Sequence, residues 1–149
     1  MNPKDQQSAK ESYDELTSGV SKSFLIDVRS RQEWFEVGVA EFLTDPRKLV
    51  LCEWRTYPAM EINENFFSEL AEKLDLQVVE NLYFICASGI RSQEAANYIS
   101  NKVNSMGLSI NCINVSDGFN GKTNAFFSLA KASGWKASGL PYCQLDQPI

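Results

Sequence analysis

One cysteine, Cys86, stands where an apolar run ends and a short polar loop begins. The run is Leu-Tyr-Phe-Ile over residues 82–85, and the loop continues as Ala-Ser-Gly-Ile-Arg-Ser to Ser92. A strand, a tight loop and a helix in this order leave the first helical amides without intrahelical partners, and such amides bind anions. The same amides, the helix dipole and the cation of Arg91 favour a thiolate. These residues predict a nucleophilic sulfur that acts on an anionic substrate.

A structural role is the alternative interpretation of Cys86, since cysteines often end buried strands as small apolar residues. Two neighbours favour the functional interpretation. Gly89 permits the positive φ that a tight loop needs, and Arg91 adds a fixed cation with forked donors. The pattern therefore indicates a reactive thiol.

Hydrophobic spacing indicates the elements that must hold this loop. After Ser92, apolar residues recur at steps of three and four, which places them on one helix face: Ala95, Ala96, Ile99, Val103 and Met106. Further strands are predicted over 23–29, 48–54 and 108–115, and further helical segments over 9–20, 31–36, 66–74 and 124–132. This alternation predicts a three-layer α/β fold, with a central, mostly parallel sheet flanked by helices. Ligands of such folds bind at the carboxyl ends of strands, where Cys86 lies.

Length and composition predict one globular domain over residues 1–149, with a core over about 9–142 and polar ends at 1–8 and 143–149. Apolar residues make up 44% and charged residues 22% of the chain. The net charge of -5 argues against nucleic acid or an anionic membrane as a partner. The first residues lack the apolar core of a signal peptide, so we expect a cytoplasmic protein with reduced thiols.

The chain contains no histidine. This removes Ser-His-Asp and Cys-His catalysis and makes the common zinc sites improbable, so we expect neither a metal nor a cofactor. The other cysteines show no C-x-x-C spacing. Cys52 and Cys112 lie within apolar strands and are predicted to be structural. Cys143 near the chain end is either a resolving thiol for Cys86 or, the favoured interpretation, a cysteine without a role.

A small charge cluster follows the first long strand. It consists of Asp27, Arg29 and Glu33. We expect an ion-pair network that fixes the end of this strand. Asp27 could also support a neighbouring active loop by accepting amide hydrogen bonds.

Three blocks of sequence together resemble the rhodanese family, the single-domain sulfurtransferases. The first is Leu-Ile-Asp-Val-Arg over residues 25–29, followed by Glu-Trp at 33–34 and Gly38. The second is the loop from Cys86 to Ser92. The third is Gly-Phe-Asn-Gly over 118–121, followed by Gly-Trp at 134–135 and Gly-Leu-Pro at 139–141. They extend over most of the chain, in the order and spacing of the family.

The resemblance implies a function for this loop. Cys86 would attack the outer sulfur of a donor such as thiosulfate, form a persulfide and pass the sulfur to a thiophilic acceptor. The loop amides would hold the anionic part of the donor; they belong to Ala87, Ser88, Gly89, Ile90, Arg91 and Ser92. Arg91 would also orient the loop and add positive charge. The implied partners are a small anionic sulfur donor or a persulfide-bearing protein, and a thiol or cyanide as acceptor.

Two departures from the family pattern affect the substrate. Many members carry a basic residue directly after the cysteine, where this chain has Ala87. Loss of that charge weakens the expected binding of thiosulfate and favours a persulfide donor carried by another protein. The first block also continues differently, as Gly-Val-Ala-Glu over 38–41, which changes the expected shape of the pocket.

Two other functions are weighed against sulfur transfer. The first is a binding or regulatory module that keeps the fold and docks an acidic or sulfurated group of a partner. The second is a cysteine phosphatase. Such enzymes use a loop with five residues between cysteine and arginine, whereas four lie between Cys86 and Arg91. The shorter loop goes with sulfur in this superfamily, so sulfur transfer is the predicted function.

Overall fold

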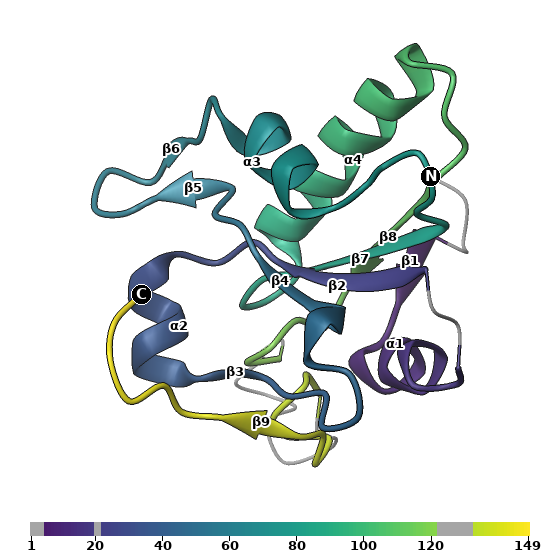
Figure 1. Ribbon diagram of the computed structural model, residues 1–149. Coiled ribbons are helices and arrows are strands. Elements are labelled where there is room, and N and C mark those ends of the chain that lie inside the picture. The colour runs from purple at the N-terminus through teal and green to yellow at the C-terminus, as the bar shows by residue number, and fades with distance from the viewer. Residues whose placement is uncertain (1–4, 20–21, 122–132) are drawn as a thin grey trace.

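The core of the structure is a five-stranded sheet in the order β1-β8-β7-β2-β4, and each pair of neighbours in it is parallel (Figure 1). The computed structural model describes residues 5–19, 22–121 and 133–149. The strands of this sheet are β1 (Gln6–Gln7), β2 (Ser23–Asp27), β4 (Leu49–Leu51), β7 (Asn81–Ile85) and β8 (Asn111–Val115). The predicted α/β fold with a central, mostly parallel sheet is confirmed.

Helices lie on both faces of the sheet, as parallel connections require. The helices are α1 (Ala9–Leu16), α2 (Arg31–Val37), α3 (Phe66–Lys73) and α4 (Ile90–Ser105), with a 3-10 turn, η2, at Pro46–Lys48. Figure 1 shows α3 and α4 on one face and α1 on the other. Each face therefore has its own apolar core.

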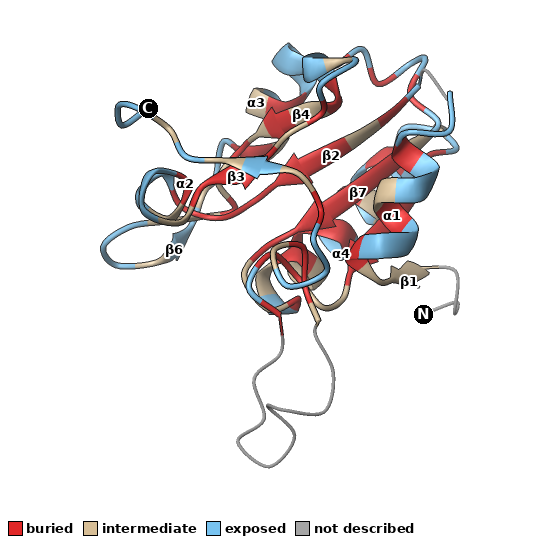
Figure 2. Ribbon diagram, turned by 90° about the horizontal axis from the view of Figure 1, so that it is seen from below, coloured by how far each residue is buried: buried red, intermediate tan, exposed pale blue. Residues whose placement is uncertain are grey.

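Neighbouring residues of each strand serve these two cores, because successive side chains point to opposite faces. Ile26 and Phe84 pack with the helix residue Ile99 in one cluster. Leu25 and Tyr83 pack with α1 and with Trp135 in the other. Figure 2 shows buried strands at the centre and an exposed outer side of α1. This packing holds the carboxyl ends of β2, β7 and β8 side by side.

Two helices begin with a complete capping box. In α2, the Ser30 side chain accepts from the Glu33 amide, and the Glu33 carboxylate accepts from the Ser30 amide. Ser8 and Glu11 do the same for α1. These serines satisfy amides that would otherwise lack partners, so the sequence fixes where each helix begins.

Several boundaries differ from those expected. The first helix ends at Leu16, and α4 begins at Ile90 because Gly89 takes a left-handed conformation as its N-cap. The strands expected over 23–29, 48–54 and 108–115 are shorter, and the helix expected over 124–132 lies outside the described residues.

The sequence did not indicate the smallest strands. β3 (Val39–Ala40) pairs with β9 (Tyr142–Cys143), and β5 (Arg55–Thr56) pairs with β6 (Glu61–Ile62), each antiparallel. β1 and β9 fall in or at the segments expected to be polar ends. Strands of two residues are too short to show a hydrophobic period, so only their partners in space define them.

Within the described ranges, each helix is too short or too polar to pass through a bilayer.

Candidate active site

Cys86 follows β7 directly, and its sulfur faces the inside of the loop. The Gly89 amide donates to Cys86 Sγ at 3.1 Å, and Ser92 Oγ lies 3.2 Å from the same sulfur. The residue is only 1% exposed. Cys86 thus borders the apolar cluster of α3 and α4, while its sulfur contacts two polar groups of the loop. This arrangement suits a thiol that must carry negative charge.

Gly89 gives the loop its shape. Its φ of 97° lies in the left-handed region, which lets the chain turn from the loop straight into α4. A Cβ at this position would lie 2.3 Å from the Ser116 carbonyl oxygen, so the loop also packs closely against the end of β8. Because the N-cap is a glycine, no side chain caps the first amides of α4. Those amides remain at the mouth of the loop, where an anion could bind.

The other predicted loop residues are distributed around this sulfur. Ala87 and Ser88 are partly buried, whereas the Ile90 side chain is exposed and points away from the fold. Arg91 and Ser92 lie in the first turn of α4, and Ser92 is fully buried. The loop thus brings the predicted residues together around Cys86.

A second turn supports the loop from behind. The Phe119 amide donates to the Cys86 carbonyl at 2.8 Å, and the Asn120 amide donates to the Ala87 carbonyl at 3.0 Å. Gly118, with a φ of 67°, allows this approach, since a Cβ there would lie 2.3 Å from the Ala87 carbonyl oxygen. The backbone of the Cys86 loop is therefore fixed on both sides.

Arg91 forms a two-pronged ion pair with Glu33 of α2. Its Nη1 and Nη2 lie 2.6 Å and 2.8 Å from the two carboxylate oxygens. Burial alone would raise the pKa of Glu33, but the attraction of Arg91 and the Ser30 hydrogen bonds outweigh it and hold this pKa at about 2. The hydrogen bond to Glu33 in turn raises the pKa of Arg91. Arg91 therefore ties the loop to α2, and its charge is largely balanced.

This ion pair predicts a loss of stability in acid. The folded-state pKa of Glu33, about 2, lies below its ordinary value of 4.5. The pair therefore stabilises the fold fully above pH 4.5 and loses that effect as the pH falls towards 2. We expect wild-type protein to lose up to roughly 3 kcal/mol of unfolding free energy over this range through this group.

The measurement is denaturant unfolding at several pH values for wild type and Glu33→Gln. The variant should be less stable at pH 7, and the difference between the two proteins should shrink towards pH 2. A difference that stays constant with pH would contradict this account of Glu33.

The charge cluster expected after β2 divides into two separate pairs. Asp27 and Arg29 form a buried ion pair at 2.6 Å, apart from the pair between Glu33 and Arg91. Arg29 also donates to the Gly38 carbonyl at 2.8 Å and lies over the Phe119 ring. The Asp27 carboxylate accepts hydrogen bonds from the backbone and side chain of Arg29. The amide that donates to Asp27 thus belongs to Arg29 and not to the Cys86 loop, and Arg29 in turn contacts Phe119.

Asn114 joins the site without having been indicated by the sequence. It is the last residue but one of β8, next to the loop, and is buried. Its Oδ1 accepts from Ser92 Oγ at 2.6 Å, and its Nδ2 donates to the Gly89 carbonyl at 3.1 Å. The only signal was a polar residue between Ile113 and Val115 near the end of an otherwise buried strand. Such a position requires hydrogen-bond partners.

The remaining cysteines lie in settings that suppress ionisation. Burial raises the pKa of Cys52 and of Cys112 to about 12. Cys143 is partly buried in β9, where burial and Glu41 raise its pKa. The structural interpretation of Cys52 and Cys112 agrees with these positions.

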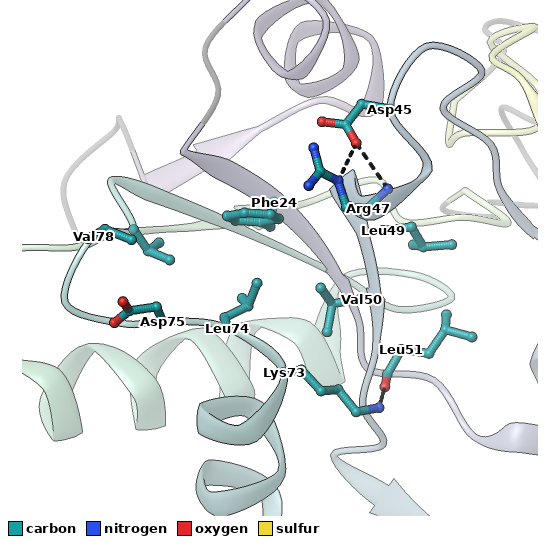
Figure 3. Close-up of a pocket in the computed structure, with 11 residues that line it drawn as sticks. Phe24, Asp45, Arg47, Leu49, Val50, Leu51, Lys73, Leu74, Asp75 and Val78 are labelled. Atoms are coloured by element: carbon teal, nitrogen blue, oxygen red, sulfur yellow. Dashed lines mark hydrogen bonds and ion pairs between the residues drawn. The ribbon is translucent and has the colours of Figure 1, made fainter.

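The structure has a groove beside the Cys86 loop and a separate cavity at the edge of the sheet. A groove of about 630 Å³ borders the loop, lined by Gln6, Ser88, Gly89, Ile90, Gln93, Glu94, Asn114 and Ser116. A cavity of about 700 Å³ lies elsewhere, at the β4 edge of the sheet (Figure 3). Its charged groups have local partners: Asp45 accepts from Arg47, and Lys73 donates to the Leu51 carbonyl. The groove is the candidate binding site because Ser88, Gly89 and Ile90 of the Cys86 loop form part of its lining, whereas no loop residue lines the cavity at β4 among the described residues.

Comparisons with known proteins agree with this fold. No model of a known protein family matches the chain. The uncharacterized protein RC0915 of Rickettsia conorii is 36% identical over 130 residues, which cover 87% of this chain and 89% of that protein. The uncharacterized protein RP600 of Rickettsia prowazekii is 35% identical over 122 residues, 82% of this chain and 84% of that one.

Two solved structures are similar to the chain. The crystal structure of Rv0390 from M. tuberculosis has a TM-score of 0.75 at 31% identity, covering 94% of this chain and 97% of that chain. A rhodanese-like domain protein from Staphylococcus aureus has a TM-score of 0.52 at 16% identity, covering 95% and 98%. At that identity the second structure is informative for the fold alone. The chain therefore belongs to one family with RC0915, RP600 and Rv0390, and its fold is rhodanese-like.

Proposed function

We propose that this protein is a sulfurtransferase that carries sulfane sulfur as a persulfide on Cys86. The observation that supports this most directly is the hydrogen bond from the Gly89 amide to Cys86 Sγ at 3.1 Å, at the uncapped start of α4. An amide donor and a helix N-terminus both stabilise negative charge on sulfur. The rhodanese-like fold agrees with this chemistry.

The reaction proceeds in two half-reactions that need no redox cofactor. The Cys86 thiolate attacks the outer sulfur of thiosulfate, and the S–S bond of the donor breaks. Sulfite leaves with the bonding electrons, and Cys86 carries a persulfide. An acceptor thiolate or cyanide then attacks the outer sulfur, and the Cys86 thiolate is released. With a persulfide donor the leaving group is a thiolate instead of sulfite.

Each part of the loop has a role in these steps. The amides at the start of α4 hold the anionic part of the donor and the outer sulfur of the persulfide. Arg91 keeps the loop on α2 through Glu33. Since Ala87 adds no charge and Glu33 balances Arg91, the field for a small anion is modest. A persulfide carried by another protein is therefore favoured over thiosulfate as the donor.

The test is sulfur loading measured by intact mass. Wild-type protein incubated with thiosulfate or with a persulfide donor should gain the mass of one sulfur atom, and cyanide should remove it. Peptide mapping should place the added sulfur on Cys86. Cys86→Ser should gain nothing, while Cys112→Ser, a change at a buried strand cysteine, should load like wild type. A cyanide-labile sulfur on Cys86→Ser would overturn the assignment.

A binding or regulatory module remains the second candidate, and one observation favours it. Cys86 is almost completely buried, and the cation nearest to it is already paired with Glu33. Such a loop could hold a partner's acidic or sulfurated group without turning it over. If no donor loads Cys86 with sulfur and the protein still binds a partner, a binding or regulatory function is supported. Robust sulfur turnover would argue against it.

A further inference from the structure

We propose that Asn114 is a positioning residue that turns the Ser92 hydroxyl proton away from Cys86 and thereby favours the protonated thiol at rest. The inference rests on the proposed role of Cys86 as the nucleophile. It concerns which atom of the Cys86–Ser92 contact carries the proton. The 3.2 Å separation of the two atoms allows either one to be the donor.

The orientation of the Asn114 amide settles that choice. Its Nδ2 lies 3.1 Å from the Gly89 carbonyl oxygen and 3.0 Å from Gln6 Oε1. A backbone carbonyl can only accept, so the group that faces Gly89 must be the amide nitrogen. A flipped amide would place two acceptors against each other. Asn114 Oδ1 is therefore the atom that faces Ser92.

The serine has only one proton to give. Ser92 Oγ lies 2.6 Å from Asn114 Oδ1, an acceptor without a proton, so the hydroxyl donates there. Its lone pairs then face Cys86 Sγ, and the contact is completed by the thiol proton. The result is a chain of donors from the thiol of Cys86 through the hydroxyl of Ser92 to the amide oxygen of Asn114.

Ionisation of Cys86 breaks this chain. When the thiol proton leaves to solvent, the Ser92 lone pairs face a negative sulfur, and the hydroxyl must rotate to donate to it. That rotation leaves Asn114 Oδ1, which is buried, without its donor. The Gly89 amide stabilises the thiolate, whereas Asn114 stabilises the protonated thiol, so the two groups act in opposite directions on Cys86.

The charged groups around Cys86 are held in pairs, and substitution of Asn114 leaves those pairs in place. Arg91 of α4 pairs with Glu33 of α2, and Arg29 pairs with Asp27 at the end of β2. Glu94, one turn further along α4, pairs with Arg55 at 3.2 Å. Of the two described partners of Cys86 Sγ, the Ser92 hydroxyl can rotate, whereas the Gly89 amide is fixed by the backbone.

The test is the pH dependence of iodoacetamide alkylation at Cys86, followed by peptide mass. Asn114→Leu keeps the approximate volume and removes the acceptor. It should move the alkylation midpoint down by about one pH unit, the value of one neutral hydrogen bond. In a Ser92→Ala background the same substitution should cause no shift, because the hydroxyl is gone. Asn111→Leu, at the exposed start of β8, is the matched control and should behave as wild type.

An unchanged midpoint in Asn114→Leu would overturn the proposal, and so would an equal shift in the Ser92→Ala background. If Asn114→Leu does not fold, the infrared S–H stretching band of Cys86 tests whether the thiol donates to Ser92. The S–H band of Cys86 is the one that Cys86→Ser removes. In wild type it should lie below the frequency of a free thiol, because the thiol donates to Ser92. In Ser92→Ala its frequency should rise. A band at the position of a free thiol would refute the proposal. Both measurements need no sulfur donor, so a failure of sulfur transfer would leave their outcome unaffected.

Discussion

Arg91→Ala will slow thiosulfate loading of Cys86 by roughly tenfold to hundredfold, well beyond any loss of folded protein. The substitution removes the two hydrogen bonds that hold the start of α4 against α2. It also removes the cation nearest to the loop and leaves Glu33 as an unpaired, partly buried carboxylate. The measurement is the rate of mass gain with thiosulfate, corrected for the folded fraction at the same temperature.

Glu33→Gln is the matched control for this prediction. It breaks the same ion pair from the other side but keeps the cation of Arg91. The two variants should be similarly destabilised, yet Arg91→Ala should lose much more loading with thiosulfate, because Glu33→Gln weakens the tie to α2 but keeps the cation. Wild-type loading rates in Arg91→Ala would show that the arginine has neither of the two roles given to it here.

Gly118→Ala will destabilise the protein by about 3 kcal/mol and lower its melting temperature by roughly 10 °C. A methyl group at this position would lie 2.3 Å from the Ala87 carbonyl oxygen and 2.6 Å from its carbon. Both atoms belong to the backbone of the active loop, so the clash cannot be relieved by a side-chain rotation. We also expect sulfur loading to fall, since the loop must move to make room. Thermal unfolding and mass gain measure the two effects.

Gly107→Ala is the control that separates the destabilisation caused by the clash from that caused by the left-handed backbone conformation. Gly107 has a similar φ, 77°, but a Cβ there meets nothing within 4 Å. This control should lose only about 1 kcal/mol, the approximate cost of a left-handed alanine. If the two alanine variants are equally stable, the close packing between the Gly118 turn and the active loop is not what fixes the loop.

The large elements of the fold could be predicted because each has enough residues to show a period. The helix after Cys86 repeats apolar residues at Ala95, Ala96, Ile99 and Val103, and all four are buried. Met106, expected on the same face, follows the last residue of α4 and is exposed, so that part of the prediction is wrong. The strand before Cys86 is a continuous apolar run, as expected for a strand buried on both faces. Two-residue strands such as β1 and β3 carry no such signal. They exist because distant segments meet, which a local pattern does not reveal.

The candidate site was predictable in part for the same reason. Cys86, Gly89 and Arg91 are close in sequence, so their chemistry and spacing could be interpreted together. Asn114 was missed because it reaches Ser92 and Gly89 from a different strand. The partner of Arg91 was also missed, since Glu33 lies on α2, and only the folded chain brings the two side chains together. Sequence proximity therefore indicated the candidate nucleophile and its loop, but not the contacts that orient them.

The turn behind the loop has a consequence for the order in which the site is completed during synthesis. The amides of Phe119 and Asn120 support the backbone of Cys86 and Ala87, yet they lie well downstream in the chain. As chains emerge from the ribosome with the N-terminus first, the cysteine leaves the exit tunnel before the turn that supports it. Until that turn and β8 follow, the thiol is carried by an unfinished loop. The nascent chain thus passes through a stage in which Cys86 is uncovered and not yet held in place.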